Sequence, residues 1–161
     1  MAGTQEKIQL LLRIAHRLNE AHVEWALGAS MLMYFKGITS EFHDIDLMVA
    51  DCDAECVRTI LSEMGENCPS DSILNPMYQT KTFMEFLIDS VEVDVMAGFA
   101  IVKDGKVYDC SLRKEQIAEK MLLGEEAIPL QSPLLWCKYY RLMGRLEKAE
   151  MIEKTIERAK R

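Results

Sequence analysis

The stretch GASMLMYFKGITSEFHDIDLMV, residues 28–49, places two aspartates beside an apolar segment that has the pattern of a buried strand. Residues i and i+2 of a strand point to the same face, so Asp44 and Asp46 project together. The alternate residues, Ile45 and Leu47, then point into the core. A buried carboxylate is costly unless it is paired, and two neighbouring carboxylates raise one another's pKa. The stretch therefore predicts either an exposed strand end or a pair of aspartates that binds a divalent cation.

A second strand-like segment, VEVDVMAG at residues 91–98, alternates apolar and acidic side chains in the same way. Its valines share one face, and Glu92 and Asp94 share the other. If this strand lies near the first, Asp94 completes a triad with Asp44 and Asp46. Magnesium prefers oxygen ligands and commonly takes its remaining ligands from water and substrate phosphates. The two segments together predict a site for Mg²⁺ or Mn²⁺.

The turn that opens the quoted stretch predicts a second kind of site. Gly28 follows the strand-like segment VEWAL, residues 23–27, and lets a ligand approach the backbone closely. Ala29 and Ser30 then open a helix, whose free backbone N–H groups favour a bound phosphate. The Ser30 hydroxyl adds another donor. The stretch thus predicts a phosphate site at one end and a metal site at the other.

The composition limits the class of protein. Of 161 residues, 49% are apolar and 28% are charged, which is typical of a soluble globular domain. The net charge of −7 argues against an extended nucleic-acid interface, although bound magnesium can supply positive charge for a phosphate ligand. We expect no signal peptide and no membrane span, because the start is polar and the apolar runs are short. The five cysteines fit a reducing cytoplasm, and Cys52 and Cys56 lack the companions of a zinc site.

The hydrophobic periodicity predicts a mixed order of elements. Helices are expected over residues 4–18, 29–36 and 53–64, strands at 23–27 and 45–50, a loop at 66–79, hairpins over 80–98 and around Asp104-Gly105, and helices from about residue 113, interrupted at Pro129 and Pro133. This order predicts an α+β fold with a small mixed, mostly antiparallel sheet, helices mainly on one face, and C-terminal helices. Residues 1–112 would form the core with its N-terminal helix. Residues 113–161 would form a helical extension packed on the same domain.

Residues 28–49 resemble the signature of the nucleotidyltransferase superfamily, whose fold is shared with DNA polymerase β. The signature is a hydrophobic residue, a glycine and a small residue, followed further along by an acid–hydrophobic–acid strand. Here it reads Leu27-Gly28-Ala29-Ser30 and then Asp44-Ile45-Asp46-Leu47. The family's third acid corresponds to Asp94. The chain is similar to small bacterial members, such as the antibiotic nucleotidyltransferases and the abortive-infection toxin group.

The resemblance implies an activity and a set of site residues. The catalytic and metal-binding residues would be Asp44, Asp46 and Asp94, and the nucleotide-binding residues Gly28, Ala29, Ser30 and Lys138. The activity would be metal-dependent transfer of a nucleoside monophosphate from an NTP, such as ATP, to a hydroxyl of a small-molecule, RNA or protein acceptor. The alternative is a catalytically inactive nucleotide-binding or regulatory protein, of toxin–antitoxin type, on the same fold. A homodimer or a partner protein is compatible with either.

The C-terminal part departs from the family's pattern. Family members often have a Gly-Arg followed by Lys-Asp, whereas Gly144-Arg145 is followed here by Leu146-Glu147-Lys148. The reversed order argues against a nucleotide role for these helices, which leaves Lys138 as the candidate near the phosphates. Trp136, Tyr139 and Tyr140 are expected to pack between helices.

Two further residues have open interpretations. His43 either packs at the mouth of its strand or reaches the site. Glu92 is either an exposed residue or an additional ligand or general base.

Overall fold

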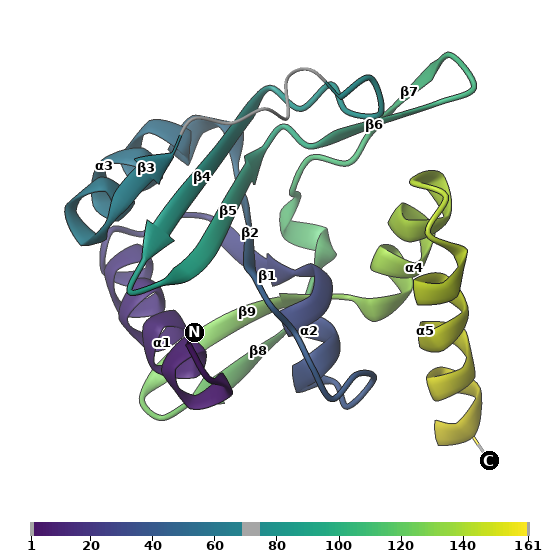
Figure 1. Ribbon diagram of the computed structural model, residues 1–161, viewed down its shortest axis with the longest axis horizontal. Coiled ribbons are helices and arrows are strands. Elements are labelled where there is room, and N and C mark those ends of the chain that lie inside the picture. The colour runs from purple at the N-terminus through teal and green to yellow at the C-terminus, as the bar shows by residue number, and fades with distance from the viewer. Residues whose placement is uncertain (1, 69–74, 161) are drawn as a thin grey trace.

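The computed structural model describes residues 2–68 and 75–160 as a seven-stranded sheet with helices packed around it (Figure 1). The helices are α1 (Thr4–Glu20), α2 (Ala29–Phe35), α3 (Ala54–Met64), α4 (Pro133–Leu142) and α5 (Leu146–Ala159), with short 3₁₀ helices η1 (Asp51–Asp53) and η3 (Lys114–Gln116). The strands are β1 (Trp25–Gly28), β2 (Ile45–Val49), β3 (Glu66–Cys68), β4 (Thr82–Ile88), β5 (Val91–Ala97), β6 (Ala100–Lys103), β7 (Lys106–Asp109), β8 (Ile117–Leu123) and β9 (Glu126–Gln131).

The sheet has the strand order β3-β4-β5-β2-β1-β9-β8, and β6 and β7 form a separate hairpin. The β2–β5 and β1–β9 pairs are parallel, and the other pairs of the large sheet are antiparallel. The predicted mixed, mostly antiparallel sheet is therefore confirmed.

The strand register gives this sheet two faces of different character. Residues that pair across neighbouring strands point to the same side. We call one side the core face: Leu47 pairs there with Val95, which pairs with Met84, and all three are buried. We call the other side the open face, and it carries Asp46 and Asp94. The alternation that the sequence predicted in both strands is confirmed.

Helices α1 and α3 pack against each other and against the sheet (Figure 1). Each is amphipathic, and the buried stripe of the two helices consists of Leu10, Leu11, Ile14, Ala15 and Leu18 with Ala54, Val57, Ile60 and Leu61. Burying one such aliphatic side chain stabilises the fold by about 1.5–3 kcal/mol. Helices α4 and α5 pack on each other at the opposite end of the molecule, where α4 also contacts α2 and β6.

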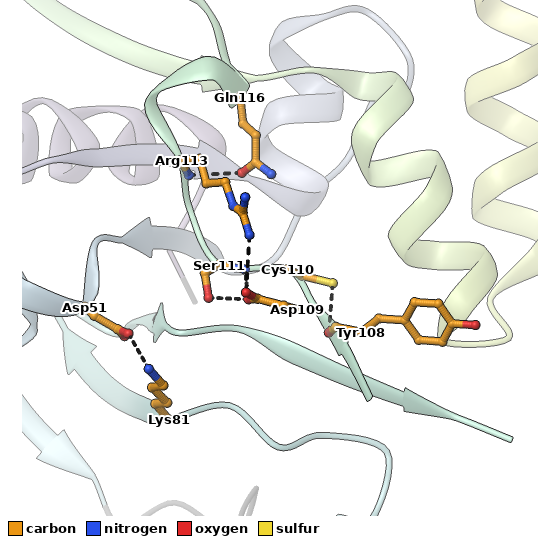
Figure 2. Close-up of polar contacts among 8 residues, drawn as sticks. All are labelled: Asp51, Lys81, Tyr108, Asp109, Cys110, Ser111, Arg113 and Gln116. Atoms are coloured by element: carbon orange, nitrogen blue, oxygen red, sulfur yellow. Dashed lines mark hydrogen bonds and ion pairs between the residues drawn. The ribbon is translucent and has the colours of Figure 1, made fainter. Parts of the chain in front are cut away.

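The chain returns from the β6–β7 hairpin to the sheet through a polar turn (Figure 2). The Asp109 carboxylate accepts hydrogen bonds from the backbone N–H (3.0 Å) and hydroxyl of Ser111 and from Arg113 (3.4 Å). Gln116 closes the turn by accepting from the Arg113 N–H at 3.2 Å. These bonds lower the pKa of Asp109, chiefly through Ser111. The turn fixes the direction in which the chain enters β8.

The prediction of helix from residue 113 is wrong for residues 117–131, which form β8 and β9. The segment is rich in helix-forming residues, but tertiary context overrides such preferences. β9 pairs with β1 and buries Ile128 and Leu130 in the core. Gly124, at φ 63, makes the tight turn between the two strands. Pro129 disfavours a helix interior at this point, and this signal was available in the sequence.

The remaining elements follow the prediction closely. Within the predicted loop at 66–79, residues 66–68 form β3, and residues 69–74 lie outside the described residues. Asp53 is the residue directly before α3, and its carboxylate accepts a hydrogen bond from the Glu24 N–H at 2.8 Å instead of capping the helix. Among the described residues, no helix has the length and apolar character to cross a membrane.

Candidate active site

One row of paired residues crosses the open face and contains the predicted acids. Asp46 of β2 pairs with Asp94 of β5 on one side and with Gly28 of β1 on the other. Asp94 pairs in turn with Glu85 of β4. Asp44 lies just before β2, close enough for its charge to act on Asp46. The structure thus brings together the three aspartates and the glycine that the sequence predicted.

The environment of the aspartates favours their protonated forms. Burial, and then the charge of Asp44, raises the pKa of Asp46 to about 7. Burial, and then the charges of Asp46 and Asp44, raises the pKa of Asp94 to about 8. Like charges in a poorly solvated site oppose ionisation, and a bound cation would remove that cost. The row therefore favours a positively charged ligand or ion.

A cavity of about 800 Å³ opens in front of this row. The sheet contributes Asp46 and Asp94 to its lining, the loop before β2 contributes Asp44, and the turn after β1 contributes Ala29 and Ser30. A volume of this size is typical of sites for small molecules and cofactors. The predicted phosphate site and the predicted metal site therefore lie in one cavity.

A basic wall of the cavity comes from the start of α5. Arg145 and Lys148 line it, and the Lys148 Nζ lies 5.3 Å from the centre of the Tyr140 ring. Burial, and then repulsion from Arg145, lowers the pKa of Lys148, while the charges of Asp46 and Asp44 oppose this shift. Cations and carboxylates thus share one cavity. This arrangement suits an anionic ligand that carries a metal ion.

Lys138, predicted to approach the nucleotide phosphates, is not among the residues that line the cavity. Its side chain is exposed, and its charge acts on Cys110. The reason is helical geometry. Trp136 and Tyr140 are four residues apart on α4 and turn toward the cavity, so the residue midway between them turns away.

Two other basic residues of the C-terminal helices, Arg145 and Lys148, line the cavity where Lys138 does not. The sequence contained a signal for them, because Arg145 and Lys148 are three residues apart and therefore share one side of a helix start. This signal was missed because the order of Glu147 and Lys148 was compared with the family's Lys-Asp. Such a comparison does not consider which side of the helix each residue occupies.

The turn after β1 has an unexpected reason for its glycine. A Cβ atom on Gly28 would lie 2.6 Å from Cζ2 of Trp136, so the indole, and not a ligand, occupies the space that a side chain would need. The next residue, Ala29, has φ 54, in the left-handed region that costs a non-glycine residue about 1–2 kcal/mol. Helix α2, which follows, has seven residues. The turn is therefore tightly packed on one side and strained at its centre.

Other polar and aromatic residues surround the cavity. His43 is exposed and lines it, whereas Glu92 is exposed and shares a hydrogen bond with Asp44. Trp136 and Tyr140 are buried and pack against each other at 5.5 Å between ring centres, as predicted. Tyr78, which the sequence did not single out, is half-buried in the cavity lining, where burial raises its pKa and the charge of Arg145 opposes that shift.

A comparison with family profiles matches only the C-terminal helices. A family profile described as "Far upstream element-binding protein, C-terminal" matches residues 134–158, which lie in α4 and α5 and include none of the sheet. No match was found among curated proteins.

Solved structures match nearly the whole chain. The proposed nucleotidyltransferase TM1012 from Thermotoga maritima is 23% identical with a TM-score of 0.71, over 98% of this chain and 96% of that one. ANT(2'')-Ia in complex with adenylyl-2''-tobramycin is 11% identical with a TM-score of 0.62, over 93% and 89% of the two chains. The solution structure of the antibiotic-resistance factor ANT(2'')-Ia is 12% identical with a TM-score of 0.66, over 96% and 86%. The chain has the nucleotidyltransferase fold.

The nucleotidyltransferase fold raises the question of whether these residues suit a divalent metal ion. Within residues 2–68 and 75–160, no group of three or more His, Cys, Asp or Glu side chains is arranged to hold one. Magnesium, however, is usually bound by one or two carboxylates together with substrate phosphates. Asp46 and Asp94 pair directly, and burial and mutual repulsion raise both of their pKa values. The donor set therefore fits a magnesium ion that arrives with a phosphate ligand.

Proposed function

We propose that this chain is a metal-dependent nucleotidyltransferase, which transfers a nucleoside monophosphate from an NTP to an acceptor hydroxyl and releases pyrophosphate. The observation that carries the proposal is the Asp46–Asp94 pair in a cavity that Arg145 and Lys148 also line. The reaction needs both kinds of charge, because the triphosphate is anionic and negative charge develops on the leaving pyrophosphate. The fold supports the same class of reaction.

The acidic residues of the cavity would bind the metal ion, and the basic residues would bind the phosphates. Asp46 and Asp94 would hold magnesium or manganese together with the substrate phosphates, and Asp44 would add its negative charge beside them. The metal, when bound, would stabilise the attacking and leaving oxygens of an in-line displacement. Arg145 and Lys148 would bind the phosphates that leave as pyrophosphate. At the turn after β1, the residues Gly28, Ala29 and Ser30 would hold the same phosphates through backbone N–H groups and the Ser30 hydroxyl.

Asp94 would also accept the proton of the attacking hydroxyl. The Asp94 carboxylate must be ionised to accept this proton, and a metal ion bound beside it would favour the ionised form. The hydroxyl oxygen bonds to the α phosphorus, its proton passes to Asp94, and the bond from the α phosphorus to the bridging oxygen breaks. Pyrophosphate leaves with that electron pair.

The nucleotide and the acceptor define the first experiments. ATP is the first nucleotide to test, because the ANT(2'')-Ia complex contains an adenylyl product. The acceptor would be a hydroxyl-bearing small molecule, an RNA or a protein. We place the activity in the cytoplasm, because all five cysteines are free thiols.

The test is pyrophosphate release and nucleotide transfer with each of the four NTPs, with magnesium, manganese or EDTA. Candidate acceptors are small hydroxyl compounds, total RNA and the protein itself. The wild type should release pyrophosphate with one NTP and a metal ion, and Asp94→Asn should not. Metal-dependent binding without release would instead support the inactive, regulatory alternative.

A matched pair of variants tests the basic wall. Arg145→Ala should weaken NTP binding by roughly 10- to 150-fold, because a charge-assisted contact contributes about 1.5–3 kcal/mol. Lys138→Ala removes an equal charge from the exposed side of α4 and should leave binding unchanged. Equal losses in both variants would contradict the assignment of Arg145 to the phosphates.

A further inference from the structure

We call Gly28, Ala29 and Ser30, the turn after β1, the phosphate turn. Two buried side chains beside it are joined by a short hydrogen bond. Trp136 Nε1 of α4 donates to Oε1 of Gln131, the last residue of β9, at 2.7 Å. Their exposed fractions are 2% and 1%. Gln131 is the buried polar residue of the described core, and burying a polar side chain is costly unless it is hydrogen-bonded. The hydrogen bond therefore fixes the position of the Trp136 indole.

That place is next to Gly28. Leu130 pairs with Leu27, so Gln131 follows it on β9 as Gly28 follows on β1. Gln131 thus continues the row of paired residues that contains Gly28, Asp46 and Asp94. The indole that Gln131 holds packs directly against Gly28. A Cβ atom added to Gly28 would lie only 2.6 Å from Cζ2 of Trp136.

Two unfavourable features accompany this contact among the described residues: backbone strain at Ala29 and an unpaired donor on Gln131. Ala29, directly after Gly28, is held at φ 54, which a non-glycine residue adopts only when its surroundings impose it. The Nε2 of Gln131 donates to no acceptor in the described part of the chain. The structure retains both costs beside a turn that lines the cavity. Costs of this kind persist where they position a functional group.

We propose that Gln131 and Trp136 are positioning residues for the phosphate turn. The Gln131 amide fixes the indole, and the indole presses on Gly28 and holds Ala29 and Ser30 in the conformation that receives the triphosphate. Because Trp136 belongs to α4, the same contact sets the turn relative to the helix that leads to Arg145 and Lys148. This inference rests on the proposed function, since it assigns these residues to the phosphates of the NTP.

A second indole provides a matched control on the same strand. Trp25 of β1 is 1% exposed, and its Nε1 donates to the side-chain oxygen of Asn19 at 2.9 Å. It lies at the opposite end of β1 from Gly28 and on the core face, where it pairs with Val49. Trp25→Phe therefore replaces an equivalent buried indole by a smaller ring and removes its hydrogen bond, at a residue that does not line the cavity.

The experiment compares Trp136→Phe, Gln131→Met and Trp25→Phe by calorimetric titration with the magnesium complexes of the four NTPs and of inorganic tripolyphosphate. Unfolding midpoints are measured in parallel. We expect all three variants to lose stability. Only Trp136→Phe and Gln131→Met should also bind NTP and tripolyphosphate about tenfold or more weakly, because a small misplacement of a positioned group has a large effect. Trp25→Phe should bind like the wild type.

Fluorescence supplies a second readout. Trp25→Phe leaves Trp136 as the single tryptophan of the chain, and its emission should change on tripolyphosphate binding. Adding Gln131→Met should shift the starting emission and remove that change. Unchanged affinity in Trp136→Phe and Gln131→Met would overturn the inference and leave the proposed function intact. No binding by the wild type would overturn both.

Discussion

The core face and the open face of the sheet are formed by the same strands, but they have opposite chemistry. On β2 and β5, Leu47 and Val95 pair on the core face and are fully buried. Their neighbours Asp46 and Asp94 pair on the open face and line a cavity. The difference arises because successive side chains of a strand point to opposite sides. One short segment thus contributes to the stability of the fold and to its site.

The comparison teaches that the two roles can be separated by single substitutions. A change on the core face should alter the free energy of unfolding. A change on the open face should alter binding and turnover, and it can even stabilise the fold, because the carboxylates are destabilised by burial and by one another.

The largest effect is expected for Asp46→Asn. The change keeps the shape of the side chain and removes its charge from the centre of the row. Transfer should fall at least about 100-fold, a loss typical of removing one electrostatic group from a reacting centre. The unfolding midpoint should stay the same or rise. A variant that keeps its activity, or that unfolds much more easily, would contradict the division between the faces.

The neighbouring residue gives the reciprocal prediction. Leu47→Ala should lower the free energy of unfolding by about 3 kcal/mol, because it leaves a cavity in a closely packed core. Urea denaturation measures this loss. Well below the unfolding transition, the affinity for NTP should match that of the wild type. A tenfold weaker affinity there would show that the two faces are coupled.

Asp94→Asn should change how stability depends on pH. In the folded chain the pKa of Asp94 is about 8, against 3.8 for an ordinary aspartate, so the native state holds a proton that the unfolded state releases. Metal-free stability should therefore fall as the pH rises from about 4 to about 8. The variant should lose part of this slope and be more stable than the wild type near pH 8.

The control for this prediction is Asp104→Asn, at the exposed turn between β6 and β7. It removes one carboxylate away from the sheet, so the slope should persist. Thermal unfolding in EDTA at pH values of about 5 and 8 measures both variants. An identical slope in Asp94→Asn and the wild type would mean that the open face does not oppose ionisation.

The smallest effect is expected at the edge of the open face. Ala29→Gly should raise the free energy of unfolding by about 0.5 kcal/mol, because relief of the left-handed strain exceeds the entropy that glycine adds to the unfolded state. Ala26→Gly, in the buried part of β1, should instead lower it by about 1 kcal/mol. Destabilisation by Ala29→Gly would show that Ala29 is not strained.

Much of the fold was predictable because the local pattern of apolar and polar residues determines most of its strands and helices. The alternation in the segments around Asp46 and Asp94 predicted two strands with acids on one side, and both form with that pattern. Periodicity failed at residues 117–131, where helix-forming residues became β8 and β9 because pairing with β1 buried Ile128 and Leu130. Local preference is weak beside such burial.

The sequence also predicted part of the candidate site. The sequence singled out the aspartates and the turn at Gly28, because each occupies a recognisable position on its own strand. It argued against a nucleotide role for the helices that carry Arg145 and Lys148, and both residues line the cavity from the far end of the chain. It explained the glycine at position 28 by the approach of a ligand and did not predict that Trp136 occupies the space of a Cβ atom there.

The sequence by itself determined which side chains share a face, since the two-residue period of a strand and the turn of a helix fix this locally. It thereby determined the acidic row and the buried core beneath it. Only the tertiary structure decided which faces meet across the cavity, which basic residues line it with Asp46, and what packs against Gly28. These contacts join residues far apart in the chain. They depend on the packing of whole elements, which no local period encodes.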